Sequence, residues 1–336
     1  MNARIDTLAV TLPQGVNHLA FSNLRQHLQT RIIGQQHLVD SLLIALLADG
    51  HLMVEGAPGL AKTTAIKELA AALQGDFRRI QFTPDLLPGD LTGTDVYRPT
   101  SGEFQFQPGP LFHNLILADE INLAPAKAQS ALLEAMGEQQ ITVGRQTYAL
   151  PRPFMVMATQ NPIEHEGTYP LPEAQLDRFL LYVRIGHPDL QAERAILKLA
   201  RQQAVGGSDP ASGAVVKISR EQIFAARSEV LNMHMGESVE EYIVQLVMAS
   251  RDVSRYDQRL ATMIQFGASP RATIALDRCS RAHAWLRNKD YVAPEDVQAV
   301  ALDVLRHRIL ITFEAEAEGV TTDAIIGDLL RLVPVA

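Results

Sequence analysis

The chain has 336 residues, and with 47% hydrophobic and 20% charged residues it can bury one large core and a second, smaller one. Its formal net charge of −8 argues against a protein that coats nucleic acid, because phosphate neutralisation requires a basic face. The single cysteine, Cys279, has no partner for a disulfide, and we interpret it as a small buried hydrophobic residue.

The N-terminal part of the chain predicts a pair of helices. The stretch after Arg4 is mixed in character and holds no unbroken apolar run, which argues against a secretory signal. Apolar positions recur at helical spacing over residues 21–47, with an interruption at the connection 32–35. The most apolar run, residues 42–48, is far shorter than the roughly 20 residues that span a bilayer. We expect a cytoplasmic protein without a membrane span.

A strand, a glycine-rich loop and a helix follow. The strand predicted at residues 51–55 leads into Gly56-Ala57-Pro58-Gly59-Leu60-Ala61-Lys62-Thr63, and an alanine-rich helix then continues to about Gly75. The loop has phosphate-loop spacing, in which backbone N–H groups wrap phosphates at a helix N-terminus. Lys62 would add a positive charge, and the Thr63 hydroxyl can ligate Mg²⁺. By itself the pattern also fits an ordinary turn between a strand and a helix.

Ala61 departs from the usual loop pattern, because a glycine generally precedes the lysine. A side chain at this place is tolerable only if the residue has a negative φ. We therefore expect the backbone of Ala61 to lie outside the left-handed region.

Later apolar runs predict further strands. Four of them have the length and composition of buried parallel strands, and they lie at residues 79–82, 115–118, 154–158 and 180–183. Two other segments predict β-hairpins that interrupt the alternation of strands and helices, formed by residues 95–98 with 103–106 and by residues 140–143 with 147–150. The first half of the chain is therefore predicted to be an α/β domain with a parallel sheet and hairpin insertions.

Asp119 and Glu120 end the strand predicted at residues 115–118. An α/β sheet presents its chemistry at the carboxyl ends of its strands, so both acids are candidates for the reaction. Asp119 would hold Mg²⁺, directly or through water, and Glu120 would orient and deprotonate the attacking water. A strand that ends in Asp-Glu is also a common surface pattern, so the pair is not specific by itself.

Helical patterns dominate from residue 188 onward, broken by a flexible stretch at residues 206–213. Ser238 with Glu241 forms a capping-box pattern, and Pro294 stands where the first residue of a helix is expected. We therefore predict an α/β nucleotide-binding core over residues 1–187 and an α-helical domain over residues 188–336.

The chain resembles the AAA+ ATPases, and specifically the MoxR family, over nearly its whole length. The most specific part of the resemblance is Ala158-Thr159-Gln160-Asn161-Pro162 together with residues 166–179, which read EGTYPLPEAQLDRF. These segments look like the sensor-1 strand and the arginine-finger helix of that family. The resemblance implies a P-loop AAA+ core followed by a helical lid domain, with the hairpins directed toward the central pore or the top face of a ring. Ala61 agrees with what is expected of this family.

The resemblance also implies roles for three polar residues. Asn161 is implied to be sensor 1, which holds the attacking water or the γ-phosphate. Arg178 is implied to be the arginine finger, which reaches the γ-phosphate bound by a neighbouring subunit. Arg271 matches the sensor-2 position at the start of a lid helix, where it would touch the nucleotide held by the core. Without the family these would be a turn-forming Asn, an ion-pair residue and a charge at a helix end.

We assign a nucleotide site that uses ATP and Mg²⁺. The predicted metal ligands are Thr63 and Asp119. The predicted catalytic residues are Glu120, Asn161, Arg178 and Arg271. The predicted nucleotide contacts are Ile33, Gly34, Gly56, Ala57, Pro58, Gly59, Leu60, Ala61, Lys62, Thr63, Thr64 and Asp119.

The resemblance implies a homo-oligomer, a hexameric ring in this family, that hydrolyses ATP to remodel or mature a client protein in a chaperone-like way. Members of the family are implied to work with proteins that carry von Willebrand factor A domains. No residue of this sequence identifies the client or the adaptor.

Two other functions stay open. A nucleic-acid motor would need basic hairpin tips, and here the tips offer Arg98 and Arg145 close to the acids Glu103 and Glu138. A nucleotide-gated scaffold would bind ATP and scarcely hydrolyse it, although no residue needed for hydrolysis is missing. A metal-dependent enzyme finds no support, because the 10 histidines show no ligand spacing.

Overall fold

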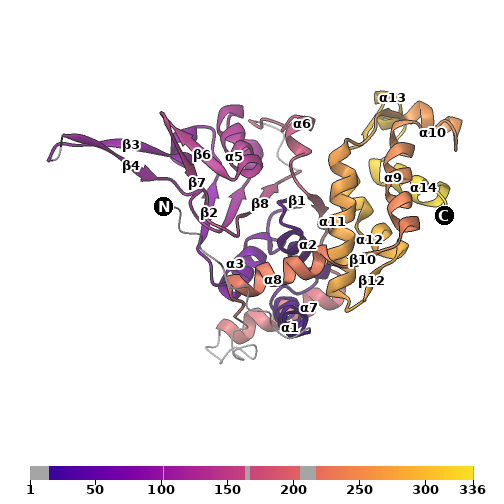
Figure 1. Cartoon of the computed structure of the whole chain (residues 1–336), viewed down its shortest axis with the longest axis horizontal. Helices are drawn as coiled ribbons and strands as arrows, with labels where there is room; N and C mark the ends of the chain where they lie inside the picture. Colours follow the sequence, from indigo (N-terminus) through magenta and orange to yellow (C-terminus); the bar gives the residue numbers. More distant parts are fainter. Residues whose placement is uncertain (1–14, 101, 163–166, 205–216, 336) are drawn as a thin grey trace, which may run out of the picture.

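The computed structural model describes residues 15–100, 102–162, 167–204 and 217–335, without the side chains of residues 202–204. Figure 1 shows an α/β part on one side and a helical part on the other, with one hairpin projecting away from the body. Arg4, Glu166 and the flexible stretch predicted at residues 206–213 lie outside the described residues.

A parallel sheet of five strands forms the centre of the α/β part. The strands follow the order β2, β5, β8, β1, β9, and every adjacent pair is parallel. Their bounds are β1 Leu52–Glu55, β2 Phe77–Gln81, β5 Leu115–Asp119, β8 Met155–Gln160 and β9 Leu181–Arg184. All five strands predicted from the apolar runs are confirmed, each within two residues of its expected limits.

Helices cover both faces of the sheet, because successive side chains of a strand point to opposite faces. Leu52 and Val54 of β1 pack into one layer, and Met53 packs into the other. The first layer holds α1 Val16–Arg31, α2 Gln36–Leu47 and α3 Lys62–Ala72. The second layer holds α4 Pro88–Thr92 and α5 Ala126–Glu138. A short 3₁₀ turn, η1 Ile121–Leu123, follows β5, and α6 Glu173–Leu176 precedes β9.

Both predicted hairpins are confirmed as antiparallel pairs. The first pairs β3 Gly93–Arg98 with β4 Glu103–Pro108, and the second pairs β6 Gln140–Val143 with β7 Gln146–Ala149. Phe106 stacks on Tyr148 with ring centroids 4.1 Å apart, which joins the two hairpins at their bases. The first hairpin then extends away from the body (Figure 1), with the exposed rings of Tyr97 and Phe104 on it.

The second half of the chain is helical. Its helices are α7 Leu190–Ala204, α8 Arg220–Leu231, α9 Glu237–Arg251, α10 Gln258–Met263, α11 Pro270–Leu286, α12 Pro294–Leu305, α13 Phe313–Ala317 and α14 Thr322–Leu332. Two small pairs of strands lie between them, β10 His234–Met235 with β12 Tyr291–Val292 and β11 Ile264–Phe266 with β13 Leu310–Ile311. None of the helices in the described ranges is long and apolar enough to cross a membrane.

One of the two helix starts predicted from capping patterns is correct. α12 begins at Pro294 as expected. The prediction for Ser238 is wrong, because α9 begins at Glu237 and its N-cap is Gly236, without a side-chain cap. Pairing of β10 with β12 holds the preceding residues extended, so the helix starts directly after that strand and Ser238 falls in its first turn.

α8 joins the two halves of the molecule. The side chain of Arg227 forms an ion pair with Asp49 at 2.6 Å, and its Nε donates to the carbonyl oxygen of Leu46 at 2.8 Å. Leu73 and Ile218 form a parallel bridge just before this helix. α8 therefore packs on the core although it follows residue 187, and the boundary between residues 187 and 188 stays a prediction.

Candidate active site

A cavity of about 300 Å³, here called the phosphate-loop cavity, opens at the carboxyl ends of β1, β5 and β8. It is lined by the loop after β1, the start of α3 and the ends of the two other strands. The lining residues are Pro58, Gly59, Ala61, Lys62, Thr63, Thr64, Asp119, Glu120 and Asn161. All of them belong to the predicted site. Parallel strands bring these distant segments together, because their carboxyl ends share one edge of the sheet.

The other predicted nucleotide contacts do not line this cavity. Gly56, Ala57 and Leu60 belong to the same loop but lie outside the lining. Ile33 and Gly34 lie between α1 and α2, where a Cβ at Gly34 would stand 2.8 Å from the Cβ of Ala192. The roles of these five residues as nucleotide contacts stay predictions.

The loop is built to receive an anion. A Cβ at Gly56 would lie 2.4 Å from Ile185 Cγ1, so glycine is required for the close approach. Lys62 Nζ donates to the carbonyl oxygen of Gly56 at 2.8 Å, which holds the positive charge over the loop. α3 begins at Lys62, and the first N–H groups of a helix lack partners within it and attract negative charge. These features together fit a phosphate chain.

The expectation for Ala61 is wrong. Its φ of 58° and ψ of 16° lie in the left-handed region. This conformation costs an L residue roughly 1–2 kcal/mol. Ala61 is the N-cap of α3, where the chain must reverse sharply from the loop into the helix, and this requirement overrides the local preference of alanine. The site therefore stores strain in the residue next to Lys62.

Asp119 is held from two sides. It is 8% exposed, and its Oδ1 accepts a hydrogen bond from Thr159 Oγ1 at 2.6 Å. Its Oδ2 accepts from Arg79 Nε at 3.0 Å and from Arg79 Nη2 at 2.7 Å. This fixed carboxylate and the Thr63 hydroxyl belong to residues that line the same cavity, and both are oxygen ligands of the kind that Mg²⁺ prefers.

Glu120 is the second strained residue of the site, with φ 56°. Its N–H donates to Thr159 Oγ1 at 3.0 Å, and its carboxylate accepts a hydrogen bond from Gln81 Nε2. Thr159 therefore positions both acids at once. Asn161 lies two residues beyond Thr159, is 5% exposed and lines the same cavity.

Three supporting residues were missed by sequence reasoning. Thr159 lies within the motif that carries Asn161, but nothing in the sequence says that it bonds two acids. Arg79 and Gln81 alternate on β2, and β2 pairs with β5 so that Gln81 stands opposite Asp119. Two long polar residues with period two on a strand of a parallel sheet were the available signal.

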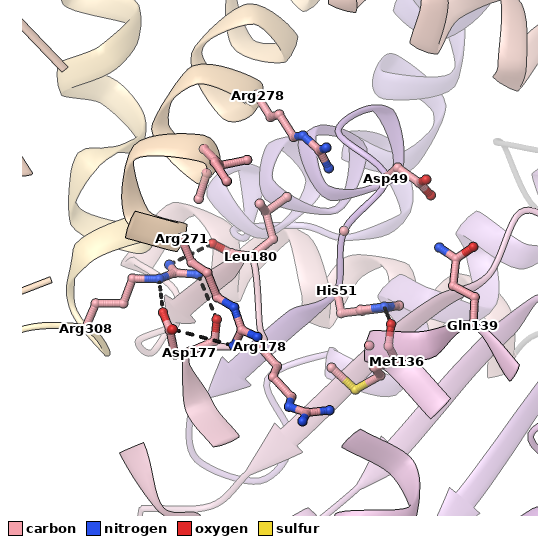
Figure 2. A pocket seen from close by; sticks show the side chains of 14 residues that line it. Asp49, His51, Met136, Gln139, Asp177, Arg178, Leu180, Arg271, Arg278 and Arg308 are labelled. Carbon is pink, nitrogen blue, oxygen red and sulfur yellow. Dashed lines mark hydrogen bonds and ion pairs between the residues drawn. The ribbon is translucent and has the colours of Figure 1, made fainter. Parts of the chain in front are cut away.

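A second cavity, of about 320 Å³ and here called the arginine cavity, lies at the amino ends of the strands. Its charged lining residues are Asp49, Asp177, Arg178, Arg271, Arg278 and Arg308. Figure 2 shows Arg178, Arg271 and Arg308 around Asp177, with Arg278 at the other end of the cavity near Asp49. Leu180 N donates to the carbonyl oxygen of His51 at 2.8 Å, which places the segment before β9 beside the start of β1.

Arg178 lies in this second cavity and not in the first. Its side chain is exposed, and its Nη1 donates to the carbonyl oxygen of Leu133 at 2.6 Å. A Cβ at Gly137 would stand 3.0 Å from that nitrogen, so the glycine leaves room for the guanidinium. β1 separates the two cavities, and its four residues span roughly 13 Å. Arg178 therefore lies at the opposite edge of the sheet from its own phosphate loop.

Arg271 also lies in the arginine cavity, which differs from our expectation that it touches the nucleotide of its own core. Its Nη1 is 3.6 Å from Asp177 Oδ2. Ser269, the N-cap of α11, donates its hydroxyl to the same Oδ2 at 2.9 Å, and Arg308 Nε lies 2.8 Å from Oδ1. These contacts fix the start of α11 beside Asp177 at the amino edge of the sheet. Packing of the helical part on the core decides this position, and the sequence does not show it.

His51 forms part of the wall of the arginine cavity. Burial lowers its pKa to about 4, so the ring is neutral at physiological pH. Its Nδ1 accepts from the N–H of Val156 at 3.1 Å, and its Nε2 lies 3.2 Å from the carbonyl oxygen of Met136. These partners favour the tautomer protonated at Nε2. The positive charge of this cavity therefore comes from the arginines alone.

The two cavities differ in chemistry. The phosphate-loop cavity offers a helix N-terminus, a lysine, a hydroxyl and two carboxylates, which suit a nucleotide triphosphate with a divalent cation. It holds no arginine that could stabilise charge on a transferred phosphoryl group. Four arginines line the other cavity, namely Arg178, Arg271, Arg278 and Arg308.

Known proteins share these features. Residues 51–181 match the profile of the ATPase family associated with various cellular activities (AAA), and residues 256–329 match the AAA lid domain. The chain is 43% identical to Chaperone MoxR1 of Mycobacterium tuberculosis, over 90% of this chain and 78% of that protein. It is 30% identical to Protein MoxR of Methylorubrum extorquens, over 94% and 93% of the two chains. A solved structure from Cytophaga hutchinsonii, of a protein proposed to be an ATPase, shares 43% identity and a TM-score of 0.87, covering 95% of this chain and 96% of that one.

Proposed function

The chain belongs to the MoxR-type AAA+ ATPases, and from this premise we propose that it hydrolyses ATP at sites shared between adjacent subunits of a ring. Each subunit would supply the phosphate loop of one site and the arginines of the next. The observation that supports this most is the position of Arg178 at the sheet edge opposite its own phosphate loop. A head-to-tail contact between copies brings the two edges together, and repetition of such a contact closes a ring.

The subunit that binds ATP would hold the phosphates and activate the water. Lys62 and the N–H groups at the start of α3 bind the β- and γ-phosphates. Thr63 and Asp119 would hold Mg²⁺, which when bound would offset part of the phosphate charge. Glu120 takes a proton from the attacking water, and Asn161 orients that water. The bonds of Thr159 and Gln81 keep Glu120 in position, so little reorganisation is needed during the reaction.

The neighbouring subunit would complete the site with its arginines. Arg178 leaves the carbonyl oxygen of Leu133 and places its guanidinium where negative charge develops on the phosphoryl group. Arg271 lies beside it and reaches the same nucleotide from the start of α11. Because neither arginine lines the phosphate-loop cavity of its own subunit, hydrolysis depends on assembly.

We further propose that ATP hydrolysis moves the lid and the hairpins, and that this movement acts on a client protein in the cytoplasm. Asp177, directly before Arg178, is bonded to Ser269 and Arg308 of the helical part, so contact with a neighbour's nucleotide is transmitted to the lid. The projecting hairpin presents Tyr97 and Phe104 to the surroundings. One relative is named a chaperone, and the family resemblance adds a hexameric ring and partners with von Willebrand factor A domains.

The variant Glu120→Gln tests this function. It should bind ATP with wild-type affinity and lose turnover by roughly 10²–10⁴-fold, the usual contribution of a general base. Affinity capture with this variant in ATP should then retain an assembled ring with a bound client protein. The exposed acid Glu240 on α9 provides a control, since Glu240→Gln should hydrolyse ATP normally. Wild-type turnover in Glu120→Gln, or a monomer without a partner in the capture, would reject the proposal.

A further inference from the structure

We propose that Arg278 is a third arginine that contacts the nucleotide of the neighbouring subunit, together with Arg178 and Arg271. The inference rests on the proposed function, because it requires a neighbour's nucleotide to enter the arginine cavity. Arg278 belongs to none of the motifs considered above, and its position in the cavity is the reason to consider it.

Arg278 and Arg271 share one face of α11. They are seven residues apart, which is two helical turns and roughly 10 Å along the axis. Ile274, between them, lines the same cavity. In Figure 2 Arg278 approaches the cavity from the helix above, while Arg271 lies with Asp177 at the other end. The two side chains can therefore engage one extended anion from two points.

The charges around Arg278 are not balanced within the subunit. Asp177 is occupied by the side chain of Arg308, which is 2% exposed, and Asp49 is occupied by Arg227 at 2.6 Å. Arg278 is exposed and forms no hydrogen bond or ion pair with any described residue. A guanidinium that lines a cavity without a carboxylate partner is suited to an anion that arrives from outside.

The anion that fits best is the phosphate chain of a nucleotide held by a second copy. The copy presents Asp119 and Glu120 at its phosphate-loop cavity, but Asp119 is buried and already paired with Arg79 at 2.7 Å. The triphosphate adds several negative charges at the mouth of the same cavity. With Arg178 and Arg271 on the terminal phosphate, Arg278 would contact the phosphates closer to the ribose.

Removal of this contact should weaken nucleotide binding only in the assembled protein. A hydrogen bond to a charged group is worth enough to change affinity by about tenfold. Arg278→Ala should therefore bind a fluorescent ATP analogue like wild type at protein concentrations that keep subunits apart. At concentrations that assemble the ring it should bind about tenfold more weakly, with a matching rise in KM. Arg278→Lys should recover part of the loss, because it restores the charge without the planar fork.

Arg287→Ala is the matched control. Arg287 caps the C-terminal end of α11, is exposed and forms no side-chain hydrogen bond or ion pair with the described residues. The Arg287→Ala substitution removes one positive charge from the same helix, far from the cavity. Its affinity for the ATP analogue and its KM should therefore match wild type at both protein concentrations, with subunits apart and with the ring assembled. An equal loss in Arg287→Ala would show that the effect of Arg278→Ala is one of general charge, and would overturn the proposal.

The outcomes separate this inference from the function on which it rests. If Arg278→Ala matches wild type while Arg178→Ala is inactive, the assignment of Arg278 is wrong and the shared site stands. If Arg178→Ala also keeps wild-type turnover, the proposed function itself fails. Sedimentation without nucleotide gives a further check, because loss of assembly under that condition would assign Arg278 to a contact between proteins and reject a contact with phosphate.

Discussion

The phosphate-loop cavity and the arginine cavity differ in how the chain builds them. The first collects a continuous loop and residues at the carboxyl ends of two strands, and it concentrates carboxylates and helix N–H groups. The second collects arginines from the segment before β9 and from the helical part, and α11, which starts beside Asp177, forms part of its wall. Under the proposed function, the two cavities are complementary halves of a shared site, which one subunit carries at opposite edges of one sheet.

Among these predictions, loss of Arg178 should have the largest effect, because it removes the contribution of the arginine cavity to hydrolysis. Arg178→Ala removes the charge proposed to reach the neighbour's γ-phosphate, and turnover should fall by roughly 10³-fold or more. The affinity of the separated subunit for ATP should stay unchanged, because Arg178 does not line its own phosphate-loop cavity. Steady-state hydrolysis and nucleotide titration measure the two quantities. If the separated Arg178→Ala subunit also lost affinity for ATP, Arg178 would act on the nucleotide of its own subunit, which would contradict the shared site.

The two cavities also differ in how well the sequence predicts them. The spacing from Gly56 to Thr63 and the acids at the end of an apolar strand are local patterns. The strands are confirmed, and every residue that lines the first cavity is among the predicted site residues, although their roles in binding and catalysis stay predictions. The position of Arg271 depends on contacts with Asp177, ninety-four residues away in the chain, and a local pattern carries no such information. Its role had to come from the family, and its location had to come from the structure.

Errors within the first cavity have a different cause. The left-handed conformation of Ala61 follows from the shape that the loop needs to enter α3, which opposes the preference of the residue. Thr159 bonds both acids because β8 lies next to β5 in the sheet, and strand order cannot be read from the strands themselves. Both the backbone conformation of Ala61 and the hydrogen bonds of Thr159 depend on tertiary structure, so they could not be predicted even though the sequence motifs were clear.

Low pH should lower the free energy of unfolding through His51, which forms part of the wall of the arginine cavity. Because burial lowers the pKa of His51 to about 4, the unfolded state binds the proton more tightly, and stability falls as the pH drops below about 6.5. Between pH 7.5 and pH 5 this residue should cost about 2 kcal/mol of unfolding free energy. Urea titrations of wild type and His51→Gln at both pH values measure it. An identical loss in the variant would assign the effect to other groups.

Loss of Thr159 should disturb only the phosphate-loop cavity. Thr159→Val keeps the shape of the side chain but leaves Asp119 Oδ1 and the N–H of Glu120 without this partner, at a cost of about 1–3 kcal/mol. Turnover should fall about tenfold, because both acids lose their positioning. Thr159→Ser retains the hydroxyl and should keep most of the turnover. Equal turnover in the Val and Ser variants would show that the hydrogen bonds do not matter.

Relief of strain at Ala61 should give the smallest effect. Ala61→Gly removes the cost of a side chain at φ 58°, and the net gain in unfolding free energy should be about 1 kcal/mol after the extra freedom of glycine in the unfolded chain is included. Chemical denaturation of the nucleotide-free protein measures the gain. A lower stability of the glycine variant would mean that the alanine makes a contact worth more than the strain.

Mixing two inactive variants tests the shared site most directly. Lys62→Ala subunits lack a working phosphate loop but keep Arg178, and Arg178→Ala subunits keep the loop but lack the arginine. When the two are mixed one to one, roughly a quarter of neighbouring pairs join an intact loop to an intact arginine. The mixture should therefore regain up to roughly a quarter of wild-type hydrolysis, while each variant alone stays inactive. A mixture that is as inactive as its components would contradict a site completed by the neighbouring subunit.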